Sequence, residues 1–213
     1  MMIKNKSKYI ILTTFCAVLF VLGCFENILN DSRQERLIKN NQFFAEAMSI
    51  LNQKTLGKDH YLSSESLLNK ALIITDDRKD RAIILSRLAY VQLIGMAEIE
   101  KAKNNSTLAL AANPDDAYAL YVDVSCDMAL AEANKNYDAV IKRIEILLSD
   151  GKDSPELPLY SFLGYLYLSK GDKLKAKGAF IEAKKHGEKS TPMEALDMLI
   201  KGLEENQEVS KPR

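Results

Sequence analysis

The chain has 213 residues, with 29 basic and 29 acidic side chains and no formal net charge at neutral pH. Because nucleic-acid binding needs a clustered basic surface, this balance predicts no nucleic-acid partner. The length suits one domain or one array of repeats.

The first segment, residues 1–23, has the pattern of a secretory signal. Three lysines precede an uncharged apolar run over residues 10–22, and Gly23 and Cys24 follow. A basic start, a short apolar run and a small-residue junction are the three parts of such a signal. The full uncharged stretch, from Tyr9 to Phe25, is slightly short for a membrane-spanning helix, which needs about 20 residues. The alternatives are an uncleaved helical anchor and an ordinary signal peptide.

The junction Val21-Leu22-Gly23-Cys24 resembles the lipobox of bacterial lipoproteins. In that family the signal is cut before the cysteine, which then carries acyl chains such as palmitate. The resemblance implies that Cys24 is the lipidated first residue, that residues 24–31 are an acylated tether, and that the chain works outside the cytoplasm. Two or three acyl chains are a sufficient anchor, since stable attachment takes two membrane signals. Phe25 replaces the aspartate that often retains Gram-negative lipoproteins at the inner membrane, which implies the outer membrane, facing the periplasm, if the source is Gram-negative.

Cleavage before Cys24 changes the charge balance only slightly. It removes three of the 29 basic residues and no acid, which leaves 26 against 29. It also removes Cys16, and acylation of Cys24 leaves Cys126 as the remaining thiol, so no intrachain disulfide is possible. The apolar neighbours Val122 and Leu130 favour a buried helical thiol at Cys126 over a nucleophile.

Beyond residue 31 the sequence predicts helices and almost no strands. Alternating apolar and polar runs are lacking, and Gly and Pro fall between segments with helical periodicity. Ser32 and Glu35 form a capping-box pattern at the start of the first helix. Thr191 and Glu194 repeat that pattern, with Pro192 at the first helical position.

Breaks between these segments recur with a fixed period. Four breaks are separated by equal intervals of 38 residues, and they are marked by Asp76, Pro114, Lys152 and Ser190. A second set lies midway between them, at Gly57, Gly95, Asn134–Asn136 and Gly171. A fixed period with a turn at mid-period predicts stacked helical hairpins, an α-solenoid. Each hairpin is too thin to bury its own apolar face, so neighbouring hairpins must stack.

The last repeat carries a family signature. It reads Tyr160-x-x-Leu163-Gly164-x-x-Tyr167, followed by Ala176-x-x-x-Phe180 and Ala183. This pattern resembles the tetratricopeptide repeat, in which an aromatic residue, Leu-Gly, Tyr, Ala and Phe recur at these separations. The resemblance implies that Gly164 lies where two helices approach closely, that Gly171 allows the turn, and that Asp172 caps the second helix. The 38-residue spacing exceeds the family's 34, which implies about one extra helical turn per repeat.

The fold expected from this resemblance is an all-α solenoid of about four tetratricopeptide-like hairpins with a C-terminal capping helix. The hairpins are 32–76 (degenerate), 77–114, 115–152 (degenerate) and 153–190, followed by the capping helix and tail at 191–213. The capping helix has one apolar face, made by Leu196, Leu199, Ile200 and Leu203. Another type of helical-hairpin repeat is the alternative.

Motifs for enzyme chemistry are lacking, so we expect no enzymatic activity, no cofactor and no metal. His60 and His186 are the only histidines, and no second set of ligands accompanies either. The sequence contains no phosphate-binding loop, nucleophile elbow or paired-cysteine motif. The aspartate pairs at 76–77 and 115–116 each precede a helix, where aspartate is the natural cap.

The same resemblance implies a concave groove lined by the first helix of each hairpin. It assigns eight partner-binding residues to this groove: Arg87, Tyr90, Tyr118, Tyr121, Ser125, Ser161, Phe162 and Tyr165. Family members that hold chaperone C-terminal carboxylates use Lys, Asn and Arg at such places; only Arg87 fits here, which argues against such a clamp. Tyrosine suits recognition, because it offers apolar area and a hydroxyl at low entropic cost. Alternatively, these tyrosines pack against the next hairpin or under the closing helix.

The sequence therefore favours a membrane-anchored extracytoplasmic lipoprotein that acts as a protein–protein interaction adaptor or assembly factor at the cell envelope. Its expected partners are a protein or peptide in the groove and the membrane, through acyl chains on Cys24. The alternative is a carrier of a small apolar ligand in the solenoid groove or beneath the closing helix. A closed apolar cavity would favour the carrier, and an open groove would favour the adaptor.

Overall fold

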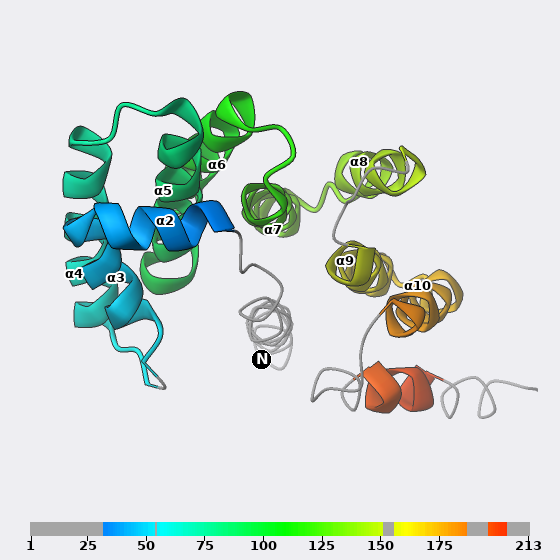
Figure 1. Cartoon of the computed structure of the whole chain (residues 1–213). Helices are drawn as coiled ribbons and strands as arrows, with labels where there is room; N and C mark the ends of the chain where they lie inside the picture. Colours follow the sequence, from blue (N-terminus) through cyan, green and yellow to red (C-terminus); the bar gives the residue numbers. More distant parts are fainter. Residues whose placement is uncertain (1–31, 54, 151–155, 187–195, 204–213) are drawn as a thin grey trace, which may run out of the picture. The chain divides into compact units, whose positions relative to one another are not determined.

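A computed structural model describes residues 32–53, 55–150, 156–186 and 196–203 (Figure 1). These residues form helices joined by turns and include no strand, which confirms the predicted all-α fold. The predicted signal, the tether with Cys24 and the cap at Thr191 lie outside the described residues.

The chain divides into two compact units, and the boundary between them falls within one helix, after residue 130. The N-terminal unit contains α2 (Ser32–Asn40), α3 (Gln42–Leu51), α4 (Lys58–Ile73), α5 (Arg78–Tyr90), the π-helix η2 (Val91–Gly95), α6 (Ile99–Ala112) and most of α7 (Ala117–Asn134). The C-terminal unit contains the last turn of α7, α8 (Asp138–Ser149), α9 (Glu156–Lys170), α10 (Lys173–Lys185) and a helical segment at 196–203.

In the N-terminal unit, α3 packs along α4 and α5 packs along α6. Phe44 of α3, Leu68 of α4 and Ile84 of α5 are fully buried in one apolar cluster, which Leu37 of α2 joins. Burial of each such side chain stabilises the folded state by about 1.5–3 kcal/mol, before the entropic cost of ordering that side chain is subtracted. The core of this unit therefore lies among α3, α4 and α5.

Side-chain caps set the starts of several helices in this unit. Asn41 begins α3, because its side chain accepts the backbone N–H of Phe44 at 3.0 Å. Asp77 begins α5 by accepting the N–H groups of Lys79 and Asp80. Asp116 accepts the N–H of Ala119 at 2.9 Å in the first turn of α7. One aspartate of each pair therefore caps a helix, as predicted.

In the C-terminal unit, α9 and α10 form a closely packed hairpin. A Cβ atom added at Gly164 would lie 2.3 Å from the ring of Phe180, so the two helices meet where the sequence predicts. Gly171 makes the turn with a φ of 85°, a left-handed conformation that glycine adopts without strain. Asp172 then accepts the N–H of Lys175 at 3.1 Å and caps α10.

The segment at 196–203 packs its apolar side chains on this hairpin. Leu196 and Leu203 are buried in a cluster with Phe180 of α10, and Leu199 and Ile200 pack against that cluster. In the described part of the closing helix, residues 196–203, the predicted apolar face therefore packs against the α9–α10 hairpin.

The mid-repeat turn near Gly95 differs from the simple glycine turn that the break pattern suggests. A Cβ atom at Gly95 would lie 2.0 Å from the ring of Tyr61, so Gly95 permits contact between η2 and α4. The left-handed residue of this turn is Ala97, with a φ of 55°. Lys135 has the same role between α7 and α8, with a φ of 54°.

Candidate functional site

The structure places most of the eight predicted groove residues in the interior. Five of the eight are buried, namely Arg87, Tyr121, Ser125, Ser161 and Phe162. Tyr121 is only 1% exposed, and the assignment of Tyr121, Ser125, Ser161 and Phe162 as surface contacts is wrong. The physical reason is that both helices are enclosed on all sides at these positions, since residues 121–126 of α7 and 161–164 of α9 are buried without interruption. A helix buried all round presents no single groove-facing stripe.

Tyr165 packs within the C-terminal unit instead of projecting as a free recognition side chain. Its ring meets Phe180 edge-on, with 5.2 Å between centroids and an interplanar angle of 74°. It lies against the apolar cluster that also contains Leu196 and Leu203. Burial raises the pKa of Tyr165 to about 12. For this tyrosine, packing with the closing segment is the alternative that the structure favours.

The three remaining predicted residues come together at one site in the N-terminal unit. Arg87 and Tyr90 lie one turn apart on α5, and Tyr118 lies in the first turn of α7. The guanidinium carbon of Arg87 is 3.5 Å from the centre of the Tyr118 ring, a cation–π geometry. The rings of Tyr90 and Tyr118 are tilted at 51°, with centroids 5.8 Å apart. We call these three residues the Arg87 cluster.

A fourth residue of this site, Gln34 of α2, was not predicted. Nη2 of Arg87 donates a hydrogen bond to the side-chain oxygen of Gln34. Arg87 is only 6% exposed, and its Nε and Nη1 have no hydrogen-bond partner among the described residues. Gln34 and Arg87 are 53 residues apart in the chain, and no motif in the sequence connects them.

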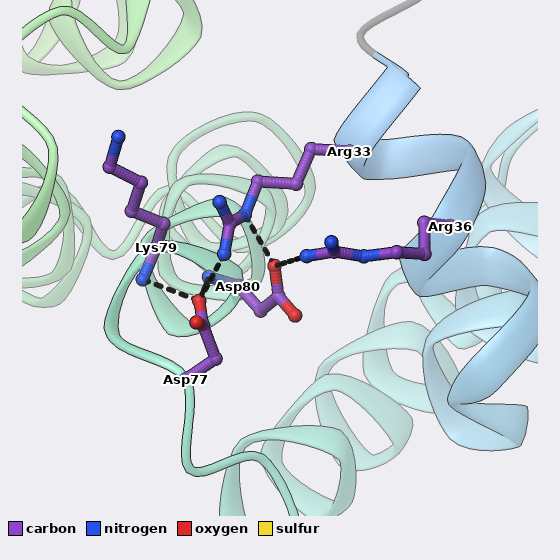
Figure 2. A network of polar contacts seen from close by, with 5 residues as sticks. All are labelled: Arg33, Arg36, Asp77, Lys79 and Asp80. Atoms are coloured by element: carbon purple, nitrogen blue, oxygen red, sulfur yellow. Dashed lines mark hydrogen bonds and ion pairs between the residues drawn. The ribbon is translucent and has the colours of Figure 1, made fainter.

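Helix α2 is held beside α5 by a network of charged side chains (Figure 2). Arg33 donates to Asp77 at 2.5 Å and to Asp80 at 2.6 Å. Arg36 approaches Asp80 at 3.4 Å. The hydrogen bond to Asp80 raises the pKa of Arg33. The backbone N–H of Asp80, followed by the Arg33 guanidinium, lowers the pKa of Asp77. We call these four residues the α2 clamp.

A second polar cluster, between α6 and α7, is structural. Asp123 is 2% exposed and accepts from Lys103 at 2.8 Å and from Ser106 at 2.8 Å. Lys103 also pairs with Asp127 at 2.6 Å. These partners all belong to α6 or α7. The set therefore joins the two helices.

The two histidines and Cys126, for which the sequence predicts no catalytic or metal-binding role, have structural contacts in the described regions. His60 accepts the N–H of Gly57 at 3.0 Å, and His186 ends α10 and stacks on Tyr160. Cys126 is fully buried, as predicted. No group of three His, Cys, Asp or Glu side chains in the described ranges is arranged to hold a metal ion.

The Arg87 cluster is the described site best suited to recognition. Its two half-buried tyrosines, held beside the buried guanidinium of Arg87, offer apolar area and hydroxyl groups, and tyrosine is enriched at protein interfaces. None of the helices that the structure describes is long and apolar enough to cross a bilayer. Comparison with known proteins gave no match: no family model, curated protein or solved structure matches the chain.

Proposed function

We propose that this protein is a membrane-anchored extracytoplasmic adaptor that binds a protein partner through the Arg87 cluster. The geometry of the Arg87 cluster is the main observation that supports the proposal. Tyr90 and Tyr118 are both half-buried, so each keeps an exposed edge while its ring is held by packing. Rings fixed in this way lose little conformational entropy when they bind a partner.

Helical hairpins support the proposal at the level of architecture. The α5–α6 pair lies within 77–114, and the α9–α10 pair lies within 153–190. The close approach of Gly164 to Phe180 matches the resemblance to the tetratricopeptide repeat. We therefore propose a solenoid of tetratricopeptide-like hairpins as the scaffold that presents the site.

Anchoring is proposed from Val21-Leu22-Gly23-Cys24. Cleavage before Cys24 and acylation would place the adaptor at the cell envelope, on the outer membrane if the source is Gram-negative. Mass spectrometry of the protein isolated from native membranes should show a mature chain that begins with acylated Cys24. Cys24→Ser should leave the uncleaved precursor. An unmodified Cys24 in the wild-type protein would contradict the proposed lipid anchor.

Binding is tested by capture from native membranes after mild crosslinking. Wild-type protein and a Tyr90→Ala, Tyr118→Ala double variant should be compared at equal abundance. A Ser66→Ala variant is the matched control, because Ser66 is an exposed residue of α4. We expect a protein that is enriched with wild type and with Ser66→Ala and is lost with the double variant. Equal enrichment in all three captures would exclude the Arg87 cluster as the partner site.

A further inference from the structure

We propose that the outward face of α10 contacts a membrane surface and binds the headgroups of anionic lipids. This face, called here the α10 face, consists of two exposed aliphatic side chains, Leu174 and Ile181, and the lysines of α10 around them. The inference rests on the membrane attachment in the proposed function, because an anchored chain is held close to a lipid surface. It adds the side of the C-terminal unit that meets this surface.

The two aliphatic side chains lie on the side of α10 that faces away from the hairpin. Leu174 is 72% exposed and Ile181 is 38% exposed. They are seven residues apart, which places them about two turns from each other on one side of the helix. The opposite side carries Phe180, which is buried in the cluster with the segment at 196–203. Between the two aliphatic residues, a Cβ atom added at Gly178 would meet no described residue within 4 Å, so the middle of the α10 face is open.

Lysines dominate the charge of α10. The helix contains five lysines and a single acidic residue, Glu182. The five are Lys173, Lys175, Lys177, Lys184 and Lys185. Lys177 is half-buried and the other four are exposed. The α10 face therefore combines exposed aliphatic area with a concentrated positive charge, which suits an anionic and partly apolar surface.

The ion pairs that these lysines make within the protein are open to solvent. Lys175 lies 3.9 Å from Asp172 and Lys185 lies 2.7 Å from Glu182, and both lysine side chains are more than half exposed. Exposed pairs of this kind contribute little to stability. The lysines can therefore exchange these carboxylates for lipid phosphates at little cost to the fold.

The combination of lysines with aliphatic side chains favours a lipid surface over a protein. Interfacial helices bury apolar side chains at the boundary of the acyl chains and direct lysines to anionic headgroups. A second copy of the chain is a poor occupant, because two lysine-rich faces repel each other. A specific protein interface buries about 800 Å² on each partner around an apolar core. Two aliphatic side chains on one convex helix supply little of such a core.

Anchoring makes a weak contact sufficient. A chain already attached to the bilayer meets the lipid surface as an intramolecular partner at a high effective concentration. The α10 face therefore does not need to bind free vesicles tightly. Its role is to set which side of the C-terminal unit rests on the membrane.

Quenching of tryptophan by brominated lipids tests this contact, because the chain contains no tryptophan. The full chain with Leu174→Trp is reconstituted into vesicles of brominated phosphatidylcholine, with and without phosphatidylglycerol, and flotation verifies equal attachment. We expect strong quenching in the anionic vesicles, weak quenching in the neutral ones, and loss of this difference at high salt. Leu62→Trp is the matched control, since Leu62 is an exposed leucine of α4 in the N-terminal unit. Its emission should be the same in both vesicles.

Lysine substitutions in the Leu174→Trp chain make the test specific for charge. Lys173→Gln combined with Lys175→Gln should lower the equilibrium constant for contact with the anionic surface at least about tenfold. Lys58→Gln combined with Lys79→Gln removes the same charge from α4 and α5 and should leave the quenching unchanged. All four lysines are exposed, so neither pair of substitutions should disturb the fold.

Equal quenching of the Leu174→Trp chain in neutral and anionic vesicles would overturn the inference, and so would quenching that survives Lys173→Gln with Lys175→Gln. If that lysine variant instead loses a protein captured from native membranes, and the anionic vesicles give no quenching, the α10 face belongs to an acidic protein. Charge-dependent quenching with an unmodified Cys24 would contradict the lipid anchor and leave the α10 face standing. An acylated Cys24 without such quenching would do the reverse.

Discussion

At the scale of single residues, the contact between Gly164 and Phe180 decides how closely α9 and α10 pack. A Cβ atom at position 164 would lie 2.3 Å from a ring that is itself fully buried. Phe180 has little room to move, because Tyr165 meets its ring edge-on and Leu196 and Leu203 lie in the same cluster. The absence of a side chain at position 164 is therefore a packing requirement.

Gly164→Ala should destabilise the protein by about 1–3 kcal/mol, because the added methyl group overpacks this contact. Leucine at the same position should cost more. Gly178→Ala is the matched control on α10, since nothing lies within 4 Å of its added Cβ. It should stabilise the protein by up to about 1 kcal/mol through helix propensity. Thermal melts of both variants provide the measurement, and a stabilising Gly164→Ala would reject the packing assignment.

Cys126 should be inert in the folded protein. Burial, with a further contribution from Asp123, raises the pKa of its thiol from 9.0 to about 12. Because the folded state holds this proton more tightly, the contribution of the thiol to stability is complete below pH 9 and is lost as the pH rises from 9 to 12. Peptide mapping after iodoacetamide at pH 8.5 should find Cys126 unmodified until denaturant is added. Rapid alkylation without denaturant would contradict this burial.

Residue-scale features with a local cause could be predicted from the sequence. Asp77, Asp116 and Asp172 cap helices because each needs only the backbone N–H groups two or three residues ahead. Gly171 makes a turn for an equally local reason. The pairing of Gln34 with Arg87 depends on the packing of α2 beside α5, and no local pattern encodes it.

At the scale of elements, α6 and α7 are joined by the buried pair of Lys103 and Asp123. Asp123 is 2% exposed and Lys103 bridges it to Asp127. Two charges removed from water stabilise the structure only while both are present. The pair therefore fixes which faces of the two helices meet.

Lys103→Met should destabilise the protein by about 3 kcal/mol, because it leaves Asp123 buried without its cation. Lys101→Met is the control on the same helix: its partner is Glu98 at 2.9 Å, and its side chain is largely exposed. That variant should leave the denaturation midpoint nearly unchanged. Chemical denaturation of both variants gives the comparison, and equal midpoints would show that the Lys103 pair is dispensable.

The existence of the helices was predictable, but the orientation of several of them was not. Apolar periodicity and the repeated breaks indicate helices, and α5 and α10 follow their capping aspartates directly. The faces of α5 and α7 could not be assigned, because residues 82–89 and 121–126 are buried without interruption. Polar members of these runs, such as Ser125, then resemble exposed positions when only the sequence is read.

At the scale of the whole molecule, the proposed array of hairpins needs an element that covers its last hairpin. Leu196 and Leu203 bury apolar area against Phe180, and Lys184 of α10 pairs with Asp197. Terminal elements with one polar face give repeat arrays their solubility. We assign this role to the segment at 196–203.

Removing the residues after Ser190 should lower the melting temperature or cause aggregation, because the last hairpin then exposes its apolar cluster. Leu203→Ala should reproduce part of the loss, at about 2 kcal/mol or more. Met198→Ala is the control, since Met198 is 70% exposed, and it should have little effect. A truncated protein that keeps full stability and binds its partner more tightly would instead identify the segment as a detachable cover.

Site-specific photo-crosslinking in the native cells tests the adaptor proposal most directly. A benzophenone side chain in place of Tyr118 keeps an aromatic ring beside Arg87, and the same group in place of exposed Ser66 is the control. We expect a discrete covalent adduct with a protein from position 118 and none from position 66. Adducts only with small apolar molecules, or equal adducts from both positions, would contradict a protein-binding site at the Arg87 cluster.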